Sequence, residues 1–257
     1  MNLRGSVKRL GERLTDTHIY RVLPRGVELA ADVARVLPAF RAELILDIGA
    51  NIGQSAREYL QCFPAAEIHC LEPVRSTFEQ LRAAVGGQAH VHLHQLALGA
   101  RSGAGRMVLQ GSHDMHFLLD EAAAAADSAL PTESVAVLTL DDFCRQRHLE
   151  RISLAKIDTE GRDLDVLTGA REWLTAQRID LVQVEAGMNP ENRRHVPLEA
   201  LKARLESHGY RLFGLYEQVE EWPQQAPHLR RANAVFVSRR TIELNTPASA
   251  VAAHAQR

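Results

Sequence analysis

Residues 44–53 read LILDIGANIG, and this stretch decides the fold. Its first five residues form a mostly apolar run with the length of a short buried strand. Apolar residues at helical spacing follow, and Gly49 and Gly53 mark the turn between the two elements. In such a unit the carboxyl end of the strand and the first amides of the helix face one crevice. The stretch therefore predicts a ligand site where this strand ends.

Strands and helices alternate along the rest of the chain, which is typical of a mostly parallel sheet covered by helices on both faces. The pattern predicts a doubly wound, Rossmann-like α/β fold. We expect a helical extension over 1–40, a main domain over 41–240 and a disordered tail over 241–257. Further strands are predicted at 68–71, 89–98, 106–109, 134–139, 152–157 and 179–184, helices at 25–37 and 162–176, and a final antiparallel pair at 210–216 and 234–237.

The composition is that of one soluble domain. Of the 257 residues, 46% are apolar and 24% are charged, which excludes a disordered chain. A formal net charge of −2 provides no broad positive field, so we expect no nucleic-acid partner. The three cysteines form no CxxC pair, as is typical of buried thiols in a reducing compartment. Without a long apolar run or a secretory signal, we expect a cytoplasmic protein with no stable membrane insertion.

An acidic residue ends the second predicted strand, 19 residues after Gly53. Glu72 is suited there to accept hydrogen bonds from both ribose hydroxyls of a nucleoside. A dinucleotide pyrophosphate requires G-x-G-x-x-G, but Asn51 and Gln54 stand at the second and third glycine positions. S-adenosylmethionine has no pyrophosphate, and Asp47 is suited to anchor its ammonium group. The sequence therefore favours S-adenosylmethionine over a nicotinamide dinucleotide.

A second motif, KIDTEG, occupies residues 156–161 at the end of another predicted strand. Lys156 is one of only three lysines in the chain, so composition does not explain it. Asp158 and Glu160 would lie beside the cofactor, where they could orient an acceptor, bind the amino group, act as a base or ligate a metal. The alternative is that one of them caps the helix that begins near residue 162.

Five segments together resemble the FkbM family of methyltransferases: DIGANIGQ at 47–54, CLEP at 70–73, VLTLDDF at 137–143, KIDTEG at 156–161 and VLTGA at 166–170. The resemblance implies a seven-stranded class I methyltransferase domain and O-methylation of a hydroxyl on a natural product, sugar or glycan. It also implies that Asp158 and Glu160 lie at the reaction centre. The predicted cofactor-binding residues are Asp47, Gly49, Asn51, Gly53, Gln54, Glu72, Pro73 and Asp158.

Residue chemistry suggests further site residues. His113 or His116 is suited to take a proton from a hydroxyl near neutral pH, with chance placement among 12 histidines as the alternative. Asp158, Glu185 and Asn189 offer oxygen ligands for a divalent metal such as Mg²⁺. The alternative is that Glu185 is a structural carboxylate, which accepts hydrogen bonds from the amides of a loop. Tyr216 and Trp222 either wall a substrate pocket or pack in the core or on the surface.

The hypothesis is an S-adenosylmethionine-dependent O-methyltransferase that transfers its methyl group in line to a small-molecule hydroxyl acceptor. A homo-oligomer is compatible with the sequence. One rival is a nicotinamide-dependent oxidoreductase, which the replaced glycines disfavour. The other rival is a non-catalytic nucleoside-binding module, against which the intact Asp158 and Glu160 argue.

Overall fold

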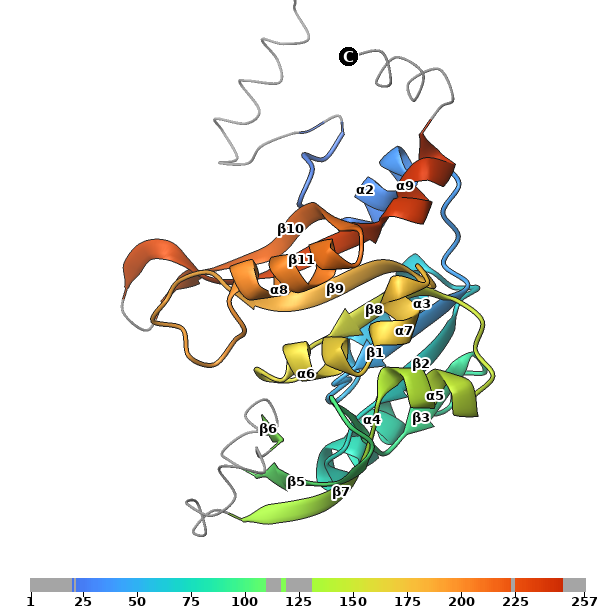
Figure 1. Ribbon diagram of the computed structural model, residues 1–257, viewed down its shortest axis with the longest axis vertical. Helices are drawn as coiled ribbons and strands as arrows, with labels where there is room; N and C mark the ends of the chain where they lie inside the picture. The colour runs from blue at the N-terminus through green and yellow to red at the C-terminus, as the bar shows by residue number, and fades with distance from the viewer. Residues whose placement is uncertain (1–19, 21, 110–116, 119–130, 223–224, 247–257) are drawn as a thin grey trace, which may run out of the picture.

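The computed structural model describes residues 20, 22–109, 117–118, 131–222 and 225–246 (Figure 1). Its main sheet consists of β1 (Leu44–Ile48), β2 (Glu67–Leu71), β3 (Val91–His94), β8 (Ile152–Ile157), β9 (Ile179–Gly187), β10 (Tyr210–Glu221) and β11 (Ala226–Ser238). The order is β10-β11-β9-β8-β1-β2-β3. Neighbouring strands run parallel except β11, which is antiparallel to both β9 and β10. The predicted doubly wound, seven-stranded sheet is confirmed.

The order of the strands changes direction at the centre of the sheet. After β1 the chain adds β2 and β3 on one side, and it later adds β8 and β9 on the other. Asp47 of β1 is therefore flanked by Cys70 of β2 and Lys156 of β8. The loops that leave β1 and β8 run to opposite faces, and such a switch point opens a crevice at the carboxyl ends of the strands.

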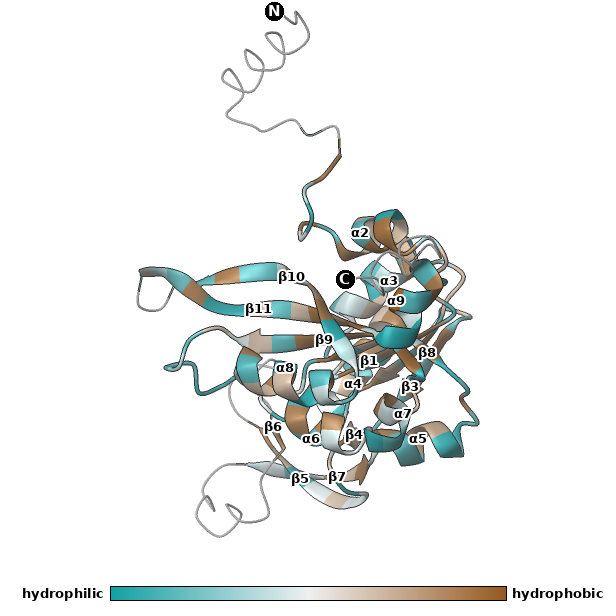
Figure 2. Cartoon of the chain, turned by 45° about the horizontal axis from the view of Figure 1, so that its top comes forward, coloured by the Kyte–Doolittle hydropathy of each residue, from teal (hydrophilic) through white to brown (hydrophobic). Residues whose placement is uncertain are grey.

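Alternating side chains of the strands form two cores, one on each face of the sheet. Leu46 and Ile48 pack in one core and Ile45 in the other. The first core is covered by α5 (Leu140–Gln146), α6 (Asp163–Thr168), α7 (Arg171–Thr175) and α8 (Leu198–Ser207), and the second by α2 (Leu29–Val36), α3 (Gln54–Cys62) and α4 (Arg75–Val85). Apolar colour lies mainly on the central strands, whereas α5 is largely coloured as hydrophilic (Figure 2). Nowhere in the described part of the chain is a helix both long and apolar enough to cross a membrane.

A smaller sheet lies beside the carboxyl end of β2. It consists of β4 (Ala97–Leu98), β7 (Thr132–Leu138), β5 (Gly103–Val108) and β6 (Phe117–Leu118), in that spatial order. Its own core joins Val74, from the loop after β2, to Met107, Val135 and Val137. This packing holds the smaller sheet against the crevice at the switch point.

Two elements differ from the sequence-based expectation. The helix predicted over 162–176 is split into α6 and α7, because the carboxylate of Asp141 accepts hydrogen bonds from the amides of Glu172 and Trp173 at 3.0 and 3.2 Å. That carboxylate starts a new helix inside the predicted one. Residues 241–245, expected in the tail, belong to helix α9 (Arg239–Asn245), where the Ser238 hydroxyl accepts from the Thr241 amide at 3.1 Å. The rest of the expected tail, 247–257, lies outside the described residues.

Candidate active site

The turn after β1 forms the floor of the site. Gly49 has a φ of 78°, and a Cβ there would lie 1.9 Å from the carbonyl oxygen of Asp158, so only glycine allows the two loops to touch. Asn51 also has a left-handed φ, of 51°. Its Oδ1 atom is buried and accepts no hydrogen bond from the described residues. A strained residue with an unsatisfied acceptor at a strand end indicates a ligand site.

A narrow slot of about 80 Å³ runs between this turn and the smaller sheet. Glu72 lines it, with Oε2 accepting from the Asn51 amide at 3.1 Å and Oε1 from the Val74 amide at 3.0 Å. Burial raises the pKa of Glu72 to about 7, against the lowering effect of these amides. Thr159 Oγ1 is a second buried polar atom here without a described partner. These acceptors fit the hydroxyl and amino groups of S-adenosylmethionine. The whole molecule is larger than the slot, so part of it would lie outside.

Lys156 is buried between two carboxylates at the end of β8. Its Nζ lies 3.2 Å from Asp158 Oδ2 and 3.5 Å from Asp47 Oδ1. Burial opposes the charge of Lys156, but Asp158 and Asp47 hold its pKa well above the usual range. Asp47 is fully buried, which raises its pKa, and it lines neither cavity. Asp47 therefore holds Lys156, and through it Asp158, from behind the lining of the two cavities.

A larger cleft of about 700 Å³ lies on the other side of the β8 loop, toward β9 and the β10–β11 hairpin. This volume is within the usual range of small-molecule sites. The slot and the cleft share four lining residues, Gly49, Asn51, Asp158 and Glu160. A ligand in the slot and a ligand in the cleft therefore meet at one wall, which carries both carboxylates of the KIDTEG motif.

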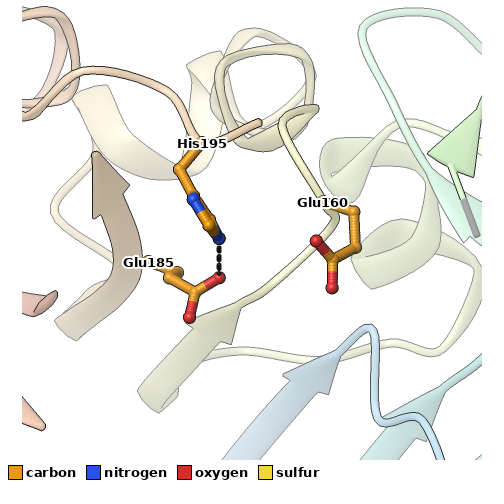
Figure 3. Close-up of side chains that lie close together, drawn as sticks. All are labelled: Glu160, Glu185 and His195. Carbon is orange, nitrogen blue, oxygen red and sulfur yellow. Dashed lines mark ion pairs between the residues drawn. The ribbon is translucent and has the colours of Figure 1, made fainter. Parts of the chain in front are cut away.

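Glu160, Glu185 and His195 point toward one another in the cleft (Figure 3). One ligand atom of each lies within 4.8 Å of those of the other two. His195 Nε2 is 2.7 Å from Glu185 Oε2, and Arg194 Nε is 2.7 Å from Glu160 Oε2. Arg231 forms an ion pair with the other oxygen of Glu185. The group thus combines an imidazole with two carboxylates that already have guanidinium partners, an arrangement suited to accept a proton.

One of the three predicted metal ligands, Asn189, uses its side-chain oxygen within its own loop. Asn189 Oδ1 accepts hydrogen bonds from the amides of Glu191 and Asn192, both at 3.0 Å, and its Nδ2 donates to Glu221. The Asn189 side chain therefore shapes the loop after β9, as asparagine commonly does in turns. In place of Asp158, Glu185 and Asn189, the residues whose potential ligand atoms converge are Glu160, Glu185 and His195.

The other predicted residues lie in several environments. Gln54 lines the cleft and Pro73 the slot, whereas Gly53 lines neither and packs beside the side chain of Leu81. Helix α6 has no side-chain cap at its N-terminal residue, so Asp158 and Glu160 are not its N-cap. His113 and His116 lie outside the described residues.

Tyr216 and Trp222 both line the cleft, and Tyr216 also packs in the core on the α2 side of the sheet. Tyr216 is buried and its hydroxyl donates to Asp32 Oδ2 at 3.0 Å, so it also anchors α2 to the sheet. Trp222 is largely exposed.

Sequence reasoning missed Arg194, His195 and Arg231. They come from the loop after β9 and from β11, so only the order of the strands brings them to Glu160 and Glu185. One signal was present: the polar run NPENRRH at 189–195 directly follows a buried strand, and loops at that end of a parallel sheet carry sites.

A doubly wound sheet with a slot and a cleft at its switch point defines an enzyme that brings a nucleoside-type cofactor to a second ligand. A family model described as the methyltransferase FkbM domain matches residues 47–212. The chain therefore belongs to the FkbM methyltransferase family. The predicted class, an S-adenosylmethionine-dependent O-methyltransferase, is confirmed.

Two relatives are similar over most of their length. The 2-O-methyltransferase NoeI of Sinorhizobium fredii is 29% identical over 195 residues, which cover 70% of this chain and 75% of NoeI. The hexuronic acid methyltransferase AglP of Haloferax volcanii is 27% identical over 179 residues, which cover 68% of this chain and 69% of AglP. The structure of Aeropyrum pernix fibrillarin with bound S-adenosyl-L-methionine aligns with a TM-score of 0.43 and 14% identity, over 82% of this chain and 74% of fibrillarin.

Proposed function

We propose that the enzyme binds S-adenosylmethionine along the slot and methylates a hydroxyl of a sugar or glycan that lies in the cleft. The observation that carries the proposal is the shared wall, because Asp158 and Glu160 border both spaces. The names of the two relatives, a 2-O-methyltransferase and a hexuronic acid methyltransferase, support O-methyl transfer to a sugar.

Residues of the slot and the shared wall would hold the cofactor. Glu72 would accept hydrogen bonds from the ribose hydroxyls, while Asn51 Oδ1 and Thr159 Oγ1 would satisfy further polar groups. Asp158, held in place by Lys156 at 3.2 Å, would accept from the cofactor's amino group. Bound S-adenosylmethionine supplies an electrophilic methyl group on a positively charged sulfur.

The cleft supplies a proton acceptor. A sugar hydroxyl has a pKa far above 7, so transfer is assisted by a base that takes its proton as the new bond forms. His195 is that base: the hydroxyl displaces Glu185 Oε2 from its 2.7 Å contact with Nε2, the ring keeps its hydrogen on Nδ1, which donates to Asn192 Oδ1 at 3.1 Å, and Nε2 accepts from the hydroxyl. Once Nε2 is protonated, Glu185 at 2.7 Å stabilises the imidazolium. Glu160 orients the acceptor from the opposite side of the group.

The charges of the cleft favour a neutral acceptor. Each cation lining the described cleft is paired with a carboxylate: Lys156 with Asp158, Arg194 with Glu160, Arg230 with Glu221, and Arg231 with Glu185. An acidic sugar would have to displace one of these carboxylates and leave it in the cleft without its partner. A hydroxyl-rich neutral sugar only needs to share the existing donors and acceptors.

The cofactor is tested by titrating S-adenosylhomocysteine into the protein by calorimetry. Glu72→Ala should weaken binding at least about tenfold, because it removes the acceptor of two hydroxyls. Glu67→Ala is the matched control, since Glu67 begins the same strand at its exposed end. Equal affinity in all three proteins, or no binding to the wild type, would contradict the assignment.

The acceptor is tested with methyl-labelled S-adenosylmethionine and a panel of methyl glucoside, methyl galactoside, methyl mannoside and methyl glucuronide. Label on a neutral glycoside supports the proposal. Label on the glucuronide alone would contradict the argument for a neutral acceptor, but a sugar would remain the acceptor. S-adenosylhomocysteine binding without label on any sugar would point to the non-catalytic rival or to another hydroxyl acceptor.

A further inference from the structure

Trp222 is an exposed aromatic side chain at the edge of the cleft. It is 70% exposed, whereas the chain's other tryptophan, Trp173, is 4% exposed in the core. Trp222 also lines the same cavity as His195 and Glu160. Exposing a large apolar ring to water is unfavourable, and tryptophan is enriched at binding interfaces, where its ring is covered and its N–H stays solvated.

The backbone around Trp222 is held in place although its side chain is free of the core. The adjacent Glu221 is only 6% exposed, and it accepts from Asn189 Nδ2 at 3.2 Å and pairs with Arg230 at 3.7 Å. The Trp222 amide donates to the Glu220 carbonyl at 2.8 Å. This anchoring fixes the backbone that carries the ring, so less of the hairpin has to be ordered when a partner binds.

The ring is connected to the proposed base through Arg230 and Asn192. The guanidinium of Arg230 lies 5.8 Å from the centre of the Trp222 ring. The backbone carbonyl of Arg230 accepts from Asn192 Nδ2 at 2.8 Å, and Oδ1 of the same side chain lies 3.1 Å from His195 Nδ1. Trp222 and His195 therefore border one cleft and are linked by a short chain of contacts.

We propose that Trp222 is a stacking platform for a second sugar residue of the acceptor, next to the residue that is methylated. The inference rests on the proposed function and adds to it that the acceptor is an oligosaccharide. The C–H face of a pyranose ring is flat and apolar, so it covers the indole, while its hydroxyls at the ring edge require hydrogen-bonding groups.

The cleft that Trp222 borders provides those groups. Arg230, Arg231, Glu217 and Asn233 line the same cleft. A purely apolar partner, such as a lipid chain or a hydrophobic protein face, would bury these groups without satisfying them. A sugar covers the indole ring with its C–H face and forms hydrogen bonds with these polar groups through its hydroxyls. Because the arginines are already paired with carboxylates, a neutral sugar is favoured.

The test is an array of immobilised neutral oligosaccharides and their terminal monosaccharide glycosides, incubated with the full-length enzyme and methyl-labelled S-adenosylmethionine. KM and kcat are then measured for the best-labelled oligosaccharide and for its terminal monosaccharide. The variants are Trp222→Ala, the conservative Trp222→Phe, and Leu244→Ala. Leu244 is the matched control, because it is 61% exposed on α9 and does not line the cleft.

We expect the wild type to prefer the oligosaccharide, and Trp222→Ala to raise its KM about tenfold or more with kcat nearly unchanged. Trp222→Phe should restore most of the affinity, and the monosaccharide should show no difference between variants. Equal KM values for Trp222→Ala and Leu244→Ala, or no preference for the oligosaccharide, would overturn the stacking platform while methylation persists. Absence of label from every sugar, with normal S-adenosylhomocysteine binding, would overturn the proposed function itself.

Discussion

The slot and the cleft adjoin one another, but the chain builds them in different ways. The slot alone takes Ile48, Leu71 and Glu72 from the ends of two consecutive strands. The cleft alone takes Glu185, His195 and Trp222 from β9, the loop after it and the final hairpin. The first region depends on local sequence and the second on the order of strands across the sheet. A cofactor site can therefore be predicted from a short motif, whereas an acceptor site depends on the completed fold.

The largest effect is expected at the wall between the two regions. Lys156→Met leaves Asp47 and Asp158 without their shared cation, and Asp47 is fully buried. The free energy of unfolding should fall by about 3–5 kcal/mol, as it does when one partner of a buried ion pair is removed. Urea denaturation followed by circular dichroism measures it.

Lys202→Met is the matched control, because Lys202 forms only an exposed pair with Glu206 at 2.7 Å. Its loss should change stability by less than about 0.5 kcal/mol. The double variant Asp47→Asn, Lys156→Met should recover part of the loss, since one buried charge is then gone. Similar stabilities for the two lysine variants would show that the wall does not depend on this ion pair.

A change confined to the cleft should leave the slot intact. His195→Ala removes the proposed base, and kcat should fall about 100-fold or more. S-adenosylhomocysteine affinity should stay within about twofold, because His195 does not line the slot. Steady-state kinetics and calorimetry on one preparation separate the two effects. His208→Ala serves as the control variant. A loss of S-adenosylhomocysteine affinity in His195→Ala as large as its loss of kcat would contradict the separation of slot and cleft.

The division also explains what sequence analysis could find. Gly49 and Glu72 were predictable because a glycine turn after one strand and an acid at the end of the next form a short pattern, although the contact that excludes a Cβ at Gly49 comes from Asp158. The position of His195 in the site was not predictable. It depends on β9 lying beside β8, which nothing in the segment around His195 shows. Asn189 was assigned to a metal for its oxygen, but the turn that it builds uses that oxygen.

A pH titration should separate the two regions through Glu72. Burial raises its pKa to about 7, and ribose hydroxyls donate only to lone pairs that the carboxylate form keeps free. Binding thus requires proton release below pH 7, so S-adenosylhomocysteine affinity should fall about tenfold from pH 8 to pH 6. Glu72→Gln should bind more weakly but with little pH dependence over this range. A wild-type affinity that is constant from pH 8 to pH 6 would contradict this role of Glu72.

The smallest effect is expected from removal of metal ions. Glu160, Glu185 and His195 have the donor types and the spacing of a metal site. Arg194 and Arg231 already pair with the two carboxylates, however, so a divalent ion there would meet two neighbouring positive charges. Dialysis against EDTA should therefore change kcat by less than about twofold, whereas Arg231→Ala should create measurable Mn²⁺ binding by calorimetry. Loss of wild-type activity in EDTA and its return with Mg²⁺ would make these residues metal ligands and remove His195 as the base.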